Sequence, residues 1–177
     1  TSLVGSEMCI RDRSKTEVFE LKLAPGTVPH RDKCRPLNPK YLEDLDRQLS
    51  EWRAAKIIEP SRSPWAAALV PVRKKNTDTL RWAVDYRKLN EAVVSDSYPL
   101  PSIETNLQRL NSSKIFTCLD SAGAFHGIEI APATRPLTAF ISPRGLWQFT
   151  RMPFGIKSSP SCYARMVANA MNSLPGD

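Results

Sequence analysis

Hydrophobic side chains recur every three or four positions in three segments of the chain, which predicts three helices. The first segment follows Asn38, an expected helix N-cap with a proline directly behind it. Residues 103–110 predict a second, shorter helix, and a third should begin at Ser159-Pro160. The apolar stripe of the first helix consists of Leu42, Leu45, Leu49 and Trp52. That of the third consists of Tyr163, Met166, Val167, Ala170, Met171 and Leu174.

Alternation and short apolar runs predict strands between these helices. The run 66–72 and the segment 80–86 flank a polar loop, and we expect them to pair as a hairpin with basic residues near its tip. Weak alternation predicts a short strand within 14–37, and the apolar run 115–119 should form a strand that ends at Asp120. Further strands are expected around 128–131, 137–141 and 147–150. Mixed helices and short hairpins indicate an α+β fold with an antiparallel sheet.

Composition narrows the class of protein. The chain has 177 residues, which suits one domain, and its formal net charge of +7 favours an anionic partner such as nucleic acid. No stretch is long and apolar enough for a membrane span or a signal peptide. Residues 1–13 look unrelated to the rest of the chain and are expected to be a non-native leader. Four cysteines without a C-x-x-C pair favour free thiols in a reducing compartment: Cys9, Cys34, Cys118 and Cys162.

Two segments carry candidate chemistry. Asp120 precedes small residues, so its carboxylate could hold one side of a magnesium ion while nearby backbone amides approach phosphate oxygens. The alternative is an ordinary turn with Phe125 in the core. Basic residues in the hairpin could fold over a triphosphate, and the alternative is a solvated charged loop. The basic residues are Arg73, Lys74, Lys75 and Arg81.

A third segment, RMPFGIKSSPSCY at 151–163, combines a constrained loop with the start of a helix. Pro153, Gly155 and Pro160 restrict the loop, and the helix beginning near Ser159 offers backbone amides. The glycine and lysine spacing of a phosphate-binding P-loop is absent, so this segment predicts no site of that kind.

Taken together, these segments resemble the reverse transcriptases of long-terminal-repeat retroelements, in particular the gypsy-like retrotransposon branch. The resemblance covers residues 16–174 and rests on several motifs in the same order. These are SPWAAALVPVRKK, LRWAVDYRKLN, YPLP, FTCLDSAGAFHGIEI, LTAF, RMPFG and SSP.

The resemblance implies a right-hand polymerase fold and assigns parts of it to this chain. Residues 14–60 would form an N-terminal arm and helix, and residues 61–177 the fingers and a partial palm. The fingers would comprise about 61–94 and 127–157, and the palm about 95–126 and 158–177. The aromatic-x-Asp-Asp motif that supplies the other metal-binding aspartates is expected beyond Asp177, so these 177 residues alone should extend no primer.

The resemblance also implies roles for individual residues. Asp120 would be the first catalytic aspartate, and the backbone carbonyl of Ser121 would complete the ligands of a magnesium ion. Phe125 would be the aromatic steric gate that excludes a ribose 2′-hydroxyl. Triphosphate contacts would come from Lys74 and Arg81 and from the amides around Gly123 and Ala124. Phe154 and Gly155 would line the nucleotide pocket and the template strand.

The implied reaction adds deoxynucleotides to a primer 3′-hydroxyl with two magnesium ions. The implied partners are an RNA or DNA template-primer and deoxynucleoside triphosphates, and no membrane partner is expected. The chain would also be joined to the rest of a polyprotein, with thumb and ribonuclease H parts and, as further candidates, integrase and protease. The location would be the cytoplasm, including virus-like particles, with access to the nucleus.

The chain departs from the family pattern at 121–124, where relatives carry a bulkier polar stretch in place of Ser-Ala-Gly-Ala. Two alternatives stay open: a decayed copy without chemistry, and a non-catalytic nucleic-acid-binding domain.

Overall fold

The computed structural model describes residues 17–73, 79–99, 102–110, 114–116, 121 and 123–172. Several sequence predictions fall outside these residues. They concern the expected leader 1–13, the basic residues Lys74 and Lys75, the two thiols Cys9 and Cys118, and Asp120, whose catalytic role stays a prediction.

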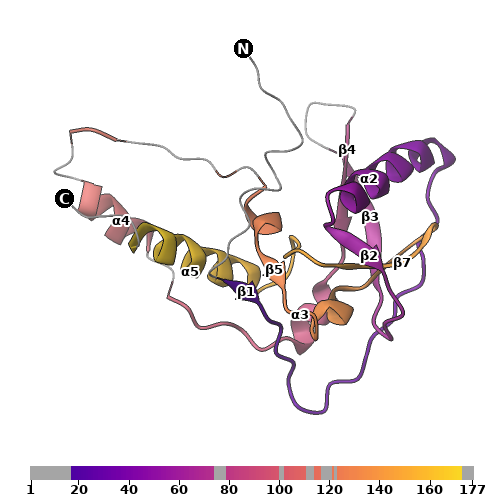
Figure 1. The fold of residues 1–177 in the computed structure, drawn as a ribbon, viewed down its shortest axis with the longest axis horizontal. Helices are drawn as coiled ribbons and strands as arrows, with labels where there is room; N and C mark the ends of the chain where they lie inside the picture. The colour runs from indigo at the N-terminus through magenta and orange to yellow at the C-terminus, as the bar shows by residue number, and fades with distance from the viewer. Residues whose placement is uncertain are drawn as a thin grey trace.

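A five-stranded sheet forms the larger lobe (Figure 1). Its spatial order is β2 (Ile58–Pro60), β7 (Gly145–Phe149), β6 (Phe140–Ser142), β3 (Ala67–Arg73) and β4 (Leu80–Val84). Neighbouring strands are antiparallel except for β3 and β6, which run parallel. The predicted hairpin is confirmed, since β3 and β4 pair over five residues, from Leu69 opposite Val84 to Arg73 opposite Leu80.

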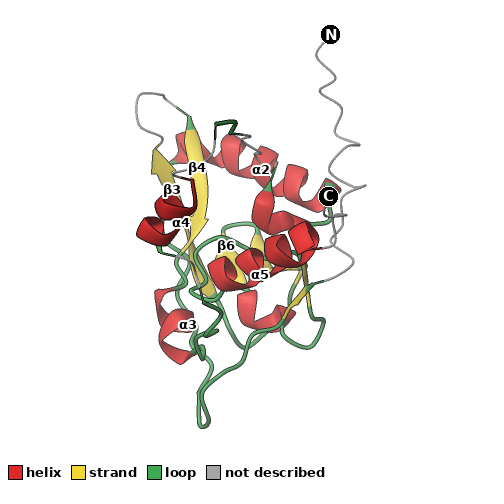
Figure 2. Ribbon diagram, turned by 90° about the vertical axis from the view of Figure 1, so that its left-hand side faces the viewer, coloured by secondary structure: helices red, strands yellow, loops and turns green. Residues whose placement is uncertain are grey.

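Helix α2 (Leu42–Ala54) packs against this sheet, preceded by the 3-10 turn η1 (Pro39–Tyr41) (Figure 2). The predicted N-cap is confirmed, because the Asn38 side chain accepts a hydrogen bond of 3.1 Å from the backbone N–H of Lys40. Leu45 and Leu49 are buried, as the stripe predicts. The Trp52 ring lies 6.3 Å from that of Phe140 and 5.8 Å from that of Phe149, which joins the helix to β6 and β7.

The smaller lobe contains helix α5 (Ser159–Asn172) and a parallel pair of short strands, β1 (Val18–Phe19) and β5 (Glu129–Ile130) (Figure 1). The predicted helix at Ser159-Pro160 is therefore confirmed, as is a short strand in the N-terminal arm. From β5 the chain enters the 3-10 turn η3 (Arg135–Thr138), which leads into the five-stranded sheet. The two lobes are thus joined by continuous, packed segments.

Two short helices complete the described structure: α3 (Arg87–Ala92) after β4, and the predicted α4 (Ile103–Leu110). The N-terminal arm runs along both lobes as an extended segment. It forms an isolated bridge between Leu23 and Val93 and another between Arg31 and Ala66. The arm therefore connects the start of the chain to the region of α3 and to β3.

Several element predictions were wrong in detail. Strand β2 was not predicted, since Pro60 was interpreted only as a helix breaker, whereas β2 pairs with β7 alone at the sheet edge, where a proline costs no ladder hydrogen bond. The expected strand 137–141 begins only at Phe140, because the 3-10 turn η3, with Pro136 near its start, occupies Arg135–Thr138. The sheet also contains the parallel β3–β6 pair, so it is not purely antiparallel.

Two apolar segments are more exposed than predicted. Of the expected strand 115–119, residues 117–119 lie outside the described ranges. Residues 115–116 are not in a strand, and Ile115 and Phe116 are 88% and 65% exposed. On α5, burial concentrates at Ser159 and Cys162, whereas Val167 and Met171 are exposed. The first turn of α5 is covered by the rest of the fold and its last turns are not, so helical periodicity alone could not identify the buried residues.

Candidate active site

Four side chains from four separate segments form a continuous row between the lobes. The Phe125 ring lies 4.8 Å from the Phe154 ring and 5.6 Å from the Tyr163 ring, measured between ring centroids. The guanidinium carbon of Arg81, on β4, lies 5.3 Å from the centroid of Phe154. The structure therefore brings together three residues that the sequence assigned to one site: Arg81, Phe125 and Phe154.

The turn that carries Phe125 depends on a glycine. Gly123 has φ +64° and caps η2 (Ala124–Gly127), a left-handed conformation that residues with a side chain adopt only at a cost. The backbone N–H of His126 donates to the Gly123 carbonyl at 2.8 Å, which closes the turn. Gly123 and Ala124 thus lie directly before Phe125, as the sequence requires, and the turn directs the ring toward Phe154.

Ser121 has a partner that sequence reasoning missed. The hydroxyl of Tyr163, on α5, donates a hydrogen bond of 2.6 Å to the Ser121 side-chain oxygen. Tyr163 was predicted only as part of an apolar stripe. No local signal could have found this contact, because 42 positions separate the two residues.

The loop that presents Phe154 is held by α3. Gly155 has φ +91°, and Asn90 fastens the backbone on both sides of it. The Asn90 amide donates to the Gly155 carbonyl at 2.8 Å, and its oxygen accepts from the Lys157 N–H at 2.8 Å. Sequence reasoning assigned Asn90 no role, although it belongs to the LRWAVDYRKLN motif.

A second residue of that motif anchors the same region. Tyr86 is buried, and its hydroxyl donates to the Thr138 carbonyl at 2.8 Å. Its burial raises the pKa of the phenol, so the hydroxyl remains a donor at neutral pH. A side chain on Gly155 would approach Tyr86 at 3.6 Å, so the loop passes close to this anchored ring. Phe154 itself remains 45% exposed at the tip of the loop.

His126 lies on the inner side of the row. Its ring stacks parallel to Phe149 at 6.4 Å and meets Phe154 edge-on at 5.4 Å. Burial lowers the pKa of the imidazole, and a hydrogen bond with the Met152 backbone opposes that effect only in part. At neutral pH the histidine is therefore uncharged, which suits an aromatic environment.

Metal ligands cannot be assembled from the described residues alone. Across the ranges that the structure describes, no three His, Cys, Asp or Glu side chains cluster as a metal site would require. Asp120 lies outside those ranges, whereas its neighbour Ser121 lies beside the aromatic row. Cys162 is a buried free thiol and Cys34 an exposed one. None of the described helices is both long and apolar enough to cross a bilayer.

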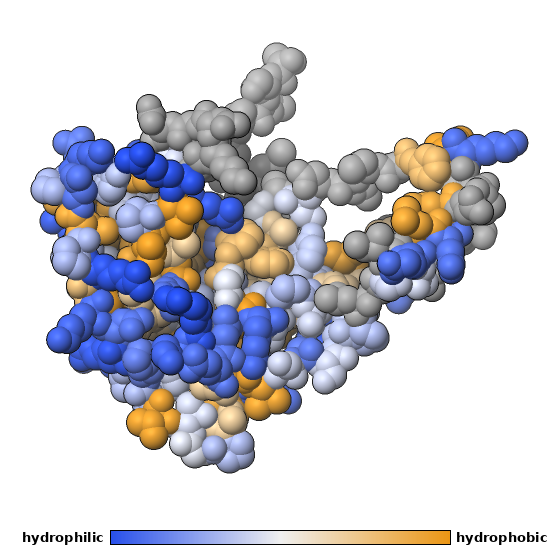
Figure 3. All heavy atoms as spheres, turned by 180° about the vertical axis from the view of Figure 1, so that it is seen from behind, coloured by the Kyte–Doolittle hydropathy of each residue, from blue (hydrophilic) through white to orange (hydrophobic). Residues whose placement is uncertain are grey.

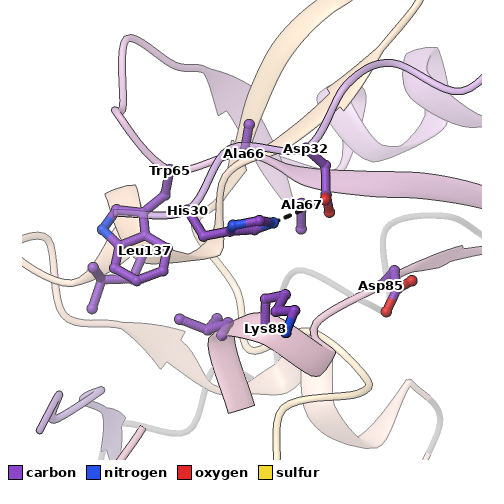
Figure 4. A pocket seen from close by; sticks show the side chains of 9 residues that line it. His30, Asp32, Trp65, Ala66, Ala67, Asp85, Lys88 and Leu137 are labelled. Carbon is purple, nitrogen blue, oxygen red and sulfur yellow. Dashed lines mark hydrogen bonds and ion pairs between the residues drawn. The ribbon is translucent and has the colours of Figure 1, made fainter. Parts of the chain in front are cut away.

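Two hollows lie apart from the row. The first lies between the arm and α3 (Figure 4). On the arm side, His30 Nε2 lies 3.0 Å from Asp32 Oδ1, and Lys88 of α3 lies opposite them. The volume of this hollow, about 10 Å³, suits a single water molecule and excludes a nucleotide. The second is a groove of about 420 Å³ between β1, residues 94–97 and the Cys162–Arg165 side of α5. Neither contains Arg81, Phe125 or Phe154.

Comparison with known proteins gives consistent matches. Residues 72–177 match the family described as "Reverse transcriptase (RNA-dependent DNA polymerase)". The chain is 36% identical over 138 residues to the Pol polyprotein of transposon 412, and 38% identical over 125 residues to that of transposon gypsy, both from Drosophila melanogaster. It is 32% identical over 165 residues to the enzymatic polyprotein of cauliflower mosaic virus (strain Strasbourg).

These matches cover 75%, 68% and 90% of this chain but only 11%, 12% and 24% of the respective relatives, so the chain spans less than a quarter of their length. Among solved structures, the native prototype foamy virus protease-reverse transcriptase superposes with a TM-score of 0.75 at 26% identity. That superposition covers 87% of this chain and 21% of the other. The foamy viral enzyme in complex with an RNA/DNA hybrid shares the fold, with a TM-score of 0.70 at 21% identity.

Proposed function

This chain belongs to the reverse transcriptase family, and from that premise we propose that it supplies the fingers and part of the palm of a gypsy-like RNA-directed DNA polymerase. The fingers are about 61–94 and 127–157, and the palm about 95–126 and 158–177. The row of Arg81, Phe154, Phe125 and Tyr163 carries the proposal. It places a cation, a loop and an aromatic ring from separate motifs side by side, as a nucleotide site requires.

The row suggests how an incoming deoxynucleotide is held. Arg81 lies at the outer end, and its cation, together with Lys74, neutralises the triphosphate. The amides around Gly123 and Ala124 approach the phosphate oxygens from the turn. Phe125 lies behind a deoxyribose and leaves no room for a 2′-hydroxyl, so selection works by exclusion. Phe154 and Gly155 line the other side, where the base pairs with the template.

Asp120 and the backbone carbonyl of Ser121 are the groups of this chain that would hold magnesium. Both are oxygen ligands, which suit this ion, but two ligands are too few for a complete site, so other parts of the protein contribute carboxylates. When bound, magnesium would supply charge stabilisation for nucleotidyl transfer from a triphosphate to a primer 3′-hydroxyl. The residues of the row position the nucleotide for that step.

The partner is a template-primer duplex of RNA or DNA. The net charge of +7 supports an anionic partner. Hydrophilic residues spread over much of the sheet-bearing lobe when it is seen from behind (Figure 3). The polyprotein relatives support a working context in which this segment is joined to further domains. Its location would be cytoplasmic, including virus-like particles, with access to the nucleus.

Primer extension by the complete polyprotein-derived enzyme tests the proposal. Asp120→Asn should lower the rate of deoxynucleotide addition on the order of 10³-fold or more, because a neutral amide cannot replace a metal-binding carboxylate. Its affinity for template-primer should stay within about twofold of the parent enzyme. Asp85→Asn is the matched control, since Asp85 pairs with Arg35 and Arg87 away from the row. Normal synthesis by Asp120→Asn would overturn the proposal.

A further inference from the structure

We propose that Tyr163 is a positioning residue that holds the gate ring of Phe125 and the backbone at Ser121 in one fixed arrangement. The inference rests on the proposed function and goes beyond it. It assigns to one side chain of α5 the task of connecting the sugar-selecting part of the site to the segment that follows the catalytic Asp120. Tyr163 would act through its contacts with Phe125 and Ser121.

The Tyr163 ring restricts the gate ring through an aromatic contact. Tyr163 meets Phe125 edge-on, with the ring planes at 63° and the centroids 5.6 Å apart. Phe154 also contacts the Phe125 ring, with the centroids 4.8 Å apart. The gate ring thus has two aromatic neighbours, one on an exposed loop and one on a helix. Such pairs contribute beyond the area they bury, and their geometry restricts the ring between them.

The Tyr163 hydroxyl makes a second, polar contact with the same turn. The Tyr163 hydroxyl donates to the Ser121 side-chain oxygen at 2.6 Å. Among the described residues, this hydrogen bond joins a side chain of α5 to the 121–127 turn. The turn has little else of this kind to fix it, because Gly123 and Ala124 carry no polar side chain. A phenylalanine at position 163 could supply the ring contact but not this bond.

Helix α5 gives Tyr163 a firm support. The first turn of α5 is buried, with Ser159 fully inaccessible and Cys162 1% exposed. The Ser159 hydroxyl donates to the Pro153 carbonyl at 3.2 Å, directly before Phe154. The helix that carries Tyr163 is therefore bound to the loop that carries Phe154. One element thus supports both neighbours of the gate ring, and a shift of Tyr163 would change the space available at the sugar.

The test measures the preference for deoxynucleotides over ribonucleotides, as a ratio of kcat/KM values, with the complete polyprotein-derived enzyme. Tyr163→Phe and Ser121→Ala should each lower this ratio about fivefold, as expected for the loss of one hydrogen bond. The double variant should do no worse than either single variant, because both remove the same bond. Tyr163→Leu, which also loses the ring contact, should lower the ratio on the order of twentyfold.

Two controls separate the outcomes. Ser161→Ala removes a hydroxyl from the same helix that contacts Asp96 rather than the turn, and it should leave the ratio unchanged. Phe125→Val should abolish most of the preference and so shows that the ratio reports on the gate. If Phe125→Val alters the ratio but Tyr163→Phe, Ser121→Ala and Tyr163→Leu do not, the positioning role is wrong and the proposed function stands. An enzyme that adds no deoxynucleotide, or a ratio insensitive to Phe125→Val, overturns both.

Discussion

The neighbours Phe125 and His126 show how one residue step changes the environment of a side chain. Phe125 contacts the rings of Phe154 and Tyr163, whereas the largely buried imidazole of His126 contacts Phe149 and Phe154. Its buried Nδ1 has no hydrogen-bond partner. Protonation would place a positive charge in this enclosed position, which is why burial lowers the pKa of the imidazole.

We expect His126 to make the stability of the chain depend on pH. Its folded pKa lies below the ordinary 6.5, so between these two values the unfolded state binds the proton more readily. The free energy of unfolding should therefore fall as pH drops through about 6.5 and level off once the folded histidine is also protonated. His126→Asn should lose this component. Urea denaturation between pH 7.5 and 5, with NMR titration of the imidazole, checks it; an imidazole that titrates above pH 6.5 would contradict it.

At the scale of elements, helix α3 organises a loop from a distant part of the chain. Asn90 acts as donor and acceptor to the backbone on either side of Gly155, although 65 positions separate it from that glycine. The positive φ of Gly155 and the buried Tyr86 beside it define the same loop conformation. The motif around Asn90 is therefore a scaffold for the tip residue Phe154.

Asn90→Ala should lower the free energy of unfolding by about 2 kcal/mol, since two hydrogen bonds to backbone groups are lost. Asn90→Asp keeps the acceptor for the Lys157 N–H but places a carboxylate oxygen against the Gly155 carbonyl, so it should recover little of the lost stability. Lys88→Ala, on the same helix, removes only an exposed pair with Glu91 and should change little. Equilibrium denaturation of the three variants provides the comparison. Equal stability of Asn90→Ala and Lys88→Ala would show that the loop holds its conformation without α3.

At the scale of the whole molecule, one arginine joins three separate segments. Arg165 on α5 donates to Glu17 at 2.7 Å and to Asp96 at 2.8 Å. Both hydrogen bonds raise the pKa of the guanidinium, which stays charged; the bond to Glu17 has the larger effect and the bond to Asp96 the smaller. The arm, the 94–97 segment and the helix that carries Tyr163 thus meet at a single cation.

Arg165→Met should destabilise the protein by about 1–2 kcal/mol, because it leaves two partly buried carboxylates unpaired near each other. Arg165→Lys should recover part of this loss, since an ammonium group cannot match the two-directional geometry of a guanidinium. Arg144→Met is the control, because its pair with Asp46 is about half exposed on both sides. Denaturation monitored together with proteolysis of the arm would check it. An arm that resists cleavage in Arg165→Met would count against this role.

Features encoded by neighbouring residues could be predicted from the sequence. The N-cap at Asn38, the stripe of α2, the β3–β4 hairpin and the start of α5 all depend on spacings of a few positions. Motif order alone indicated the family, which the comparisons confirm. The catalytic role of Asp120 stays a prediction, because this residue lies outside the described ranges. These features follow from local backbone preferences and from the periodicity of helices and strands, which any contiguous segment already contains.

Only the tertiary structure decided which distant groups meet. Asn90 bonds to Gly155 across 65 positions, and Tyr163 bonds to Ser121 across 42. The parallel pairing of β3 with β6 likewise joins distant parts of the chain. It also decided that α5 is buried at its first turn, because burial depends on which elements pack against a helix and not on its own periodicity. The sequence by itself therefore determined the segments and their chemistry. Packing between elements determined which of those segments lie side by side.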